Sequence, residues 1–189
     1  MGTFLIGLFL FLGIHSVSIV NEPWRDQMVK KMGEWPWKGV YSLVSIFGFI
    51  LMLWGYGSAR STTSILYSSP LWIQNLSLLL LLPVFPLLIA AYFPGRIKAT
   101  AQHPMLLATI LWAIAHLLTA GSVLNVLLFG SFLGWAVVDR ISVQRRRQRA
   151  TPGAPSAKYN DSIACVVGLG LYLAFIFWLH ELLIGVSPY

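Results

Sequence analysis

Four histidines are the residues of this chain whose chemistry stands out: His15, His103, His116 and His180. A neutral imidazole is a common metal ligand in proteins. Two of the four lie in QHPMLLATILWAIAHLLTAG (102–121), a segment that is otherwise almost entirely apolar. An ionisable side chain in such a segment is energetically costly, which makes it a candidate for a functional site. Its role depends on the elements that hold it.

The composition predicts that these elements are membrane-spanning helices. Hydrophobic residues make up 57% of the chain and charged residues only 10%, and the mean hydropathy is +0.74. A soluble domain of ordinary composition has about 25% charged residues. A helix needs about 20 mostly apolar residues to cross a bilayer, and six segments meet this need. We therefore expect one all-α integral membrane domain over 1–189, a bundle of six transmembrane helices at 3–20, 39–57, 71–93, 104–120, 123–138 and 162–185.

The basic residues predict the orientation of this bundle. Of the 13 Lys and Arg, all except Arg60 fall in three alternate loops, which follow the first, third and fifth spans. Because Lys and Arg are retained in cytoplasmic loops, we expect both termini on the non-cytoplasmic side. The run RRRQR (145–149) lies in the loop between two predicted spans. We therefore interpret it as an orientation signal and expect no nucleic-acid partner.

Three further patterns concern packing. Tryptophans flank the segment 24–37, and its spacing predicts a short helix lying in the membrane interface. Pro83 and Pro86 are expected to kink the third span and to free backbone carbonyls there. Gly130 and Gly134 form a GxxxG pattern, which indicates close approach of a neighbouring helix.

Helical geometry separates His103 from His116. His103 precedes Pro104 at the cytoplasmic end of the fourth span, and His116 lies about 20 Å further along the axis. One metal ion cannot bind both. The face around His116 mixes a tryptophan with small residues and would suit a flat cofactor. Its members are Thr109, Trp112, Ala113 and Ala120.

Imidazoles from two different helices commonly hold haem b in a helical bundle. A zinc protease is excluded because the chain has no HExxH motif. By depth, His15 in the first span pairs equally well with His116 or with His103. His180 lies near the outer end of the last span, where a snorkelling side chain is expected. An interior His116 bonded only to a backbone carbonyl stays an alternative.

Asp139 and Arg140 follow the fifth span on its cytoplasmic side. They can orient a ligand or accept a haem propionate. The alternative is an interfacial ion pair with an orientation-setting arginine.

The chain resembles the NnrU family of small bacterial membrane proteins, whose relatives include the 15-cis-zeta-carotene isomerases. The resemblance covers nearly the whole chain. It is carried by GIHSVSIV (13–20), WKGVYSLVSIFGFILMLWGYG (37–57), HPMLLATILWAIAHLLTAG (103–121), LLFGSF (127–132), VVDRISVQRR (137–146) and GVSP (185–188).

The resemblance implies a haem b protein of the bacterial inner membrane. It implies His15 and His116 as the iron ligands, and we expect Trp112, Arg140 and His103 as further cofactor contacts. It also implies a role in nitric oxide metabolism and denitrification, or in the haem-dependent cis-trans isomerisation of a polyene. The expected ligands are accordingly nitric oxide or an apolar polyene, with membrane lipids around the protein.

Two other functions fit parts of the sequence. One is a haem-free assembly factor for a nitrogen-oxide enzyme. The other is a small membrane methyltransferase, in which the His103-Pro104 region would help to hold S-adenosylmethionine. Against the second, Gln102 stands where such enzymes usually have arginine.

Overall fold

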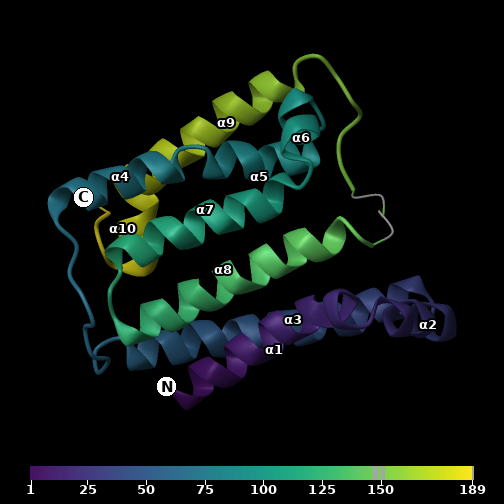
Figure 1. Cartoon of the computed structure of the whole chain (residues 1–189), viewed down its shortest axis with the longest axis horizontal. Coiled ribbons are helices and arrows are strands. Elements are labelled where there is room, and N and C mark those ends of the chain that lie inside the picture. The colour runs from purple at the N-terminus through teal and green to yellow at the C-terminus, as the bar shows by residue number, and fades with distance from the viewer. Residues whose placement is uncertain (147–148, 150–151, 189) are drawn as a thin grey trace. The chain divides into compact units, whose positions relative to one another are not determined.

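The computed structural model describes residues 1–146, 149 and 152–188, and in these residues the regular secondary structure is helical, without strands (Figure 1). The chain forms two compact units. One comprises Met1–Tyr67 with Ser122–Arg147, and the other comprises Ser68–Gly121 with Gln148–Tyr189. Arg147 of the predicted basic loop lies outside the described residues. The expectation of one domain over 1–189 stays a prediction.

The first unit contains four helices: α1 (Gly2–Val20), α2 (Glu22–Met32), α3 (Glu34–Ala59) and α8 (Val123–Val143). An isolated β-bridge between Ile65 and Ser122 joins the segment after α3 to the residue before α8. The hydrophobic core of this unit contains Phe4 and Leu8 of α1, Met52 of α3 and Leu124 of α8.

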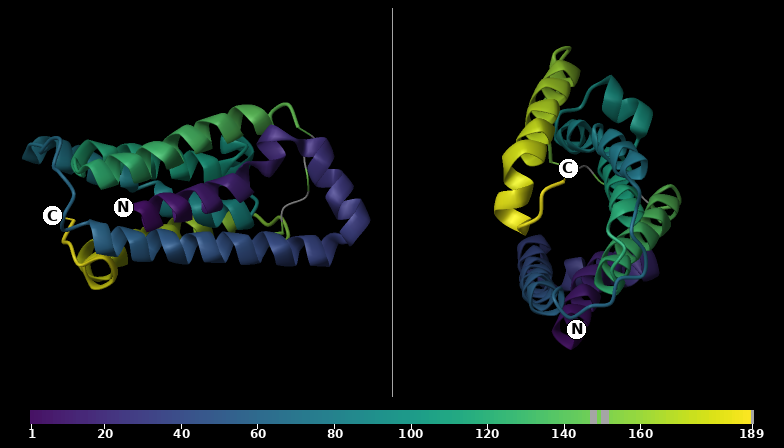
Figure 2. Two further views of the ribbon diagram at one scale, coloured as in Figure 1. Left: turned by 90° about the horizontal axis from the view of Figure 1, so that it is seen from below. Right: turned by 90° about the vertical axis from the view of Figure 1, so that its left-hand side faces the viewer.

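Helices α1 and α3 lie side by side and antiparallel (Figures 1 and 2). Glycines allow this close approach. A Cβ at Gly48 would lie 2.7 Å from the backbone nitrogen of Phe11, and one at Gly55 would meet the backbone of Phe4. Gly7 of α1 faces the backbone of Met52 in the same way. The close contact is therefore made by these glycines. In the described residues of this unit, a Cβ at Gly130 or Gly134 would meet nothing within 4 Å, so the GxxxG pattern makes no close contact here and stays a prediction.

Helix α2 is a short helix after the first span, as expected, and its position in the membrane interface stays a prediction. The Asn21 side chain caps it by accepting a hydrogen bond from the backbone N–H of Trp24 at 3.0 Å. The helix ends at Gly33, whose φ of 89° favours glycine. The remaining tryptophans of the segment belong to α3, so the expected single helix over 24–37 is in fact two.

The second unit contains α4 (Leu71–Leu81), α5 (Val84–Tyr92), α6 (Arg96–Ala101), α7 (Pro104–Thr119), α9 (Asn160–Ala174), the π-helix η1 (Phe175–Leu179) and α10 (His180–Ile184). Helix α9 packs along α5 (Figure 1), where Gly168 lies against Pro86.

The break between α4 and α5 confirms the predicted interruption at Pro83. The N–H of Leu82 bonds to the carbonyl of Leu79 instead of continuing the α-helical pattern to Leu78. The Leu78 carbonyl accepts instead a 2.7 Å hydrogen bond from the Tyr172 hydroxyl of α9. A neighbouring helix thus satisfies a backbone group that the proline releases.

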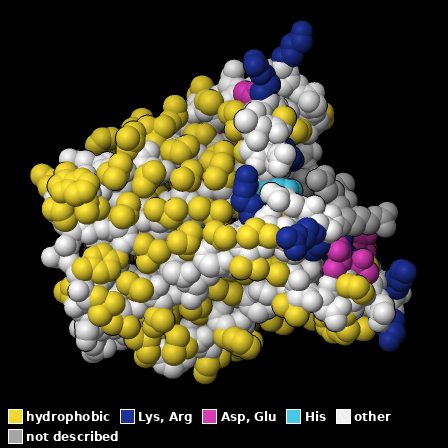
Figure 3. All heavy atoms as spheres, viewed as in Figure 1, with side chains coloured by type: hydrophobic (Ala, Val, Ile, Leu, Met, Phe, Trp, Pro, Cys, Tyr) yellow, Lys and Arg dark blue, Asp and Glu magenta, His cyan; other side chains and the backbone are white. Residues whose placement is uncertain are grey.

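Five segments are long and apolar enough to cross a membrane: α1, α3, α4 with α5, α8, and α9 through α10. They correspond to five of the six predicted spans. The remaining one, 104–120, is the apolar helix α7 with 16 residues. Within each of the five long segments, at most 28% of the apolar 18-residue window is buried inside the protein. Figure 3 shows hydrophobic side chains over much of the viewed face, which is consistent with a lipid environment. The chain has the character of a multi-pass membrane protein.

Candidate functional site

His15 lies in the last turns of α1 and is partly buried. Its Nδ1–H donates a 2.6 Å hydrogen bond to the carbonyl of Phe11, one helical turn earlier. This bond satisfies the ring, and it also places the proton on Nδ1. Nε2 then carries the lone pair, which is the tautomer of a metal-binding histidine.

Aromatic rings from three helices surround His15. The ring centre of Phe11 lies 4.4 Å away, that of Tyr41 from α3 at 5.2 Å, and that of Trp135 from α8 at 6.0 Å. The Trp135 ring stands perpendicular to the imidazole. Tyr41 and Trp135 were not predicted as site residues, since nothing in their local sequence distinguishes them from lipid-facing aromatics.

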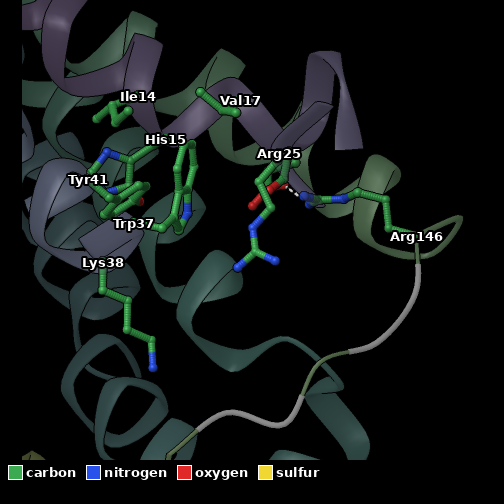
Figure 4. Close-up of a pocket in the computed structure, with 10 residues that line it drawn as sticks. Ile14, His15, Val17, Arg25, Trp37, Lys38, Tyr41 and Arg146 are labelled. Atoms are coloured by element: carbon green, nitrogen blue, oxygen red, sulfur yellow. Dashed lines mark hydrogen bonds and ion pairs between the residues drawn. The ribbon is translucent and has the colours of Figure 1, made fainter. Parts of the chain in front are cut away.

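A cavity of about 300 Å³ opens beside His15, within the first unit (Figure 4). It forms where the final residues of α1 and α8 meet the first turns of α3. The residues that line it come from α1 (Ile14, His15, Val17, Ser18), α2 (Arg25), α3 (Trp37, Lys38, Tyr41), and α8 and the turn after it (Asp139, Arg146).

Cations outnumber acids in this lining. The lining holds three cations, Arg25, Lys38 and Arg146, and one carboxylate, that of Asp139, which forms an ion pair with Arg146. The Asp139 and Arg146 side chains are only 16% and 14% exposed. Arg25 also pairs with Asp26 at 3.0 Å. The cavity therefore offers guanidinium donors to an anionic group.

Two buried donors near His15 have no hydrogen-bond partner in the described part of the chain. They are Nε of Arg146 and Nε1 of Trp135. An unsatisfied buried donor costs about 1–3 kcal/mol. Such atoms point to an acceptor supplied by a bound group or by water.

Arg140, the predicted partner of a propionate, does not line this cavity, whereas its neighbour Asp139 does. The cations at the cavity come instead from loop and helix-end positions. These had been interpreted from the sequence only as orientation signals. Their common location depends on which helix ends meet, and the sequence carries no local signal for that.

His116 belongs to the second unit, near the end of α7. Its Nδ1–H donates to the carbonyl of Trp112 at 2.8 Å, and the Trp112 ring centre lies 5.3 Å away. This carbonyl bond is the one foreseen for an interior histidine. As in His15, it also selects the metal-binding tautomer.

The structure brings His180 beside His116, which the sequence did not predict. Their ring centres are 6.4 Å apart and the ring planes differ by 24°. His180 follows η1 directly, and its Nδ1–H donates to the carbonyl of Val186 at 2.6 Å. The expected snorkelling side chain is thus bonded to the backbone close to a second imidazole.

His103 precedes the first residue of α7, as its position before Pro104 predicts. It lies at the opposite end of this helix from His116, so the two do not share a site. In the described residues no group of three His, Cys, Asp or Glu side chains forms a metal site.

The fold and the histidine sites define an all-helical protein of membrane-spanning character, with imidazoles held in the tautomer that binds metals. The chain belongs to the NnrU family: the family model described as NnrU protein matches residues 3–188. No curated protein and no solved structure matches the chain.

Proposed function

We propose that this NnrU family member binds haem b in the bacterial inner membrane through histidine side chains. The ligands that the resemblance implies are His15 and His116. The observation that carries the proposal is the bond from each Nδ1–H to a carbonyl one turn earlier. It leaves a basic Nε2, and haem iron binds imidazole nitrogen. Trp112, His103 and Arg140 stay predicted cofactor contacts.

The surroundings of His15 support haem for a second reason. Haem combines a flat apolar ring system with two carboxylates. Around His15 the chain supplies aromatic rings together with the guanidinium groups of Arg25 and Arg146. The unsatisfied Nε of Arg146 fits an acceptor of this kind. Bound haem would supply an iron site that accepts nitric oxide or contacts a polyene.

The proposal includes six membrane spans with both termini on the non-cytoplasmic side, α7 being the fourth span. Cations from two loops expected in the cytoplasm support this topology. Arg25 precedes the second span and Arg146 follows the fifth, and both line one cavity. Loop residues that share a cavity belong on the same side of the membrane.

For the reaction that the haem would serve, we propose the two possibilities that the family resemblance implies. One is nitric oxide metabolism in denitrification, and the other is isomerisation of a polyene. A haem-free assembly factor and a methyltransferase that uses S-adenosylmethionine near His103 are the competing outcomes.

Absorption spectra of histidine variants test the proposal. We expect His15→Ala and His116→Ala, purified in detergent, to lose the sharp low-spin bands of the reduced protein. Added imidazole should restore these bands, because it replaces the missing ligand. Phe9→Ala and Met105→Ala are matched controls, since they remove exposed side chains from the same two helices and should leave the spectrum unchanged.

Three results would count against the proposal or against its ligand assignment. A protein that takes up no haem at any stage excludes the haem function, and calorimetric binding of S-adenosylmethionine that is lost in His103→Ala would favour the methyltransferase. Unchanged low-spin spectra in both His15→Ala and His116→Ala would exclude the ligand assignment while leaving haem binding in place.

A further inference from the structure

We infer that the cavity beside His15 binds the two carboxylates of the haem, with Arg146 and Arg25 as their partners. This inference rests on the proposed function. It names the residues that fix the orientation of the cofactor on its iron ligand.

Arg146 is the principal partner. One terminal nitrogen of its guanidinium donates to Asp139, and its Nε is buried without an acceptor among the described residues. A guanidinium has five N–H donors in a planar fork that matches a carboxylate. Asp139 therefore anchors one edge of the group and leaves other donors for an incoming carboxylate. Asp139 acts as a positioning residue.

Arg25 is the second partner, from a different helix. Its NH1 donates to Asp26 at 3.0 Å, which uses one of its five donors. The side chain is 24% exposed and lines the cavity together with Arg146 (Figure 4). Two arginines from separate elements match a ligand that carries two carboxylates.

Lys38 contributes less, although it also lines the cavity. It pairs with Glu34 at 2.7 Å, and the two side chains are 56% and 66% exposed. An exposed pair of this kind is screened by water. Replacing Lys38 is therefore expected to weaken carboxylate binding less than replacing either arginine.

The volume of the cavity is sufficient for one part of the haem. At about 300 Å³ it is at the lower end of the range for small-molecule pockets. It suits the polar edge of a large planar ligand, while His15 in the lining is the group that can reach the metal.

The test compares haem with its dimethyl ester, in which both carboxylates are blocked. The full chain in detergent is titrated with each, and binding is followed by the Soret band. We expect haem to bind at least about tenfold more tightly than the ester, because charge-assisted hydrogen bonds are lost with the ester. In Arg146→Gln and Arg25→Gln this preference should shrink, in Lys38→Gln it should shrink less, and in Arg60→Gln it should persist.

Each outcome separates the inference from the proposed function. A wild-type protein that binds the ester as tightly as haem overturns the inference but leaves haem binding intact. So does an equal loss of preference in Arg60→Gln and Arg146→Gln. A protein that binds neither compound contradicts the proposed function itself. If Arg146→Gln does not fold, Arg146→Lys keeps the charge without the planar fork and should also reduce the preference.

Discussion

The hydrogen bonds of single side chains give the histidines of this protein their chemical character. His15, His116 and His180 each donate Nδ1–H to a backbone carbonyl. For the first two, the acceptor is four residues earlier in the same helix, so a helix alone is enough to set the tautomer. The sequence predicted where these residues fall in their helices. It could not predict that a π-helical turn and the Val186 carbonyl would bring His180 to His116.

The ion pair of Asp139 with Arg146 makes a residue-level prediction for stability. In Asp139→Asn the largely buried Arg146 loses its counter-charge, and we expect the free energy of unfolding to fall by about 2 kcal/mol. Glu34→Gln is the matched control, because it breaks an exposed pair and should change stability by less than about 1 kcal/mol. Thermal unfolding in detergent measures both. Equal effects in the two variants would mean that burial does not strengthen the Asp139 pair.

At the level of elements, glycines decide how closely helices approach. The sequence analysis singled out one glycine pattern, Gly130 and Gly134 of α8, and this is not the pattern that joins α1 to α3. The four-residue spacing in α8 faces open space, whereas Gly48 and Gly55 in α3 lie against the backbone of α1. Gly48 and Gly55 are seven residues apart, which returns to nearly the same helical face. The sequence analysis did not single them out, because which helix pairs with which depends on the whole fold.

Two glycines of α3 provide a matched pair for this contact. Gly55→Ala should lower the free energy of unfolding by about 1–3 kcal/mol, because the new methyl group meets the backbone of Phe4. Gly57→Ala is two residues away with nothing within 4 Å, and it should be neutral or stabilising by up to about 1 kcal/mol. Thermal unfolding of both variants checks this. Loss of stability in Gly57→Ala alone would contradict the α1–α3 packing.

For the molecule as a whole, the apolar segments largely follow from composition and length. Five of six predicted spans recur as segments long enough to cross a membrane, and Pro83 interrupts the third as expected. The clustering of cations at the cavity does not follow from composition or length. Arg25 and Arg146 are far apart in the sequence, and only the meeting of helix ends joins them.

The topology of the whole chain makes a further prediction. In a Cys165→Ser background, Ser61→Cys should react with a membrane-impermeant thiol reagent added to intact spheroplasts, in which the outer face of the inner membrane is accessible. Lys30→Cys should react only after the membrane is opened, since basic loops stay in the cytoplasm. The reverse labelling pattern would invert the proposed orientation.

The central claim is that this NnrU family member holds haem b. The most direct measurement is the absorption spectrum of the purified full chain, oxidised and then reduced with dithionite, together with a pyridine haemochrome assay. The account predicts a Soret band, sharp low-spin bands on reduction and near-stoichiometric haem b. A colourless protein that also fails to take up added haemin would contradict it.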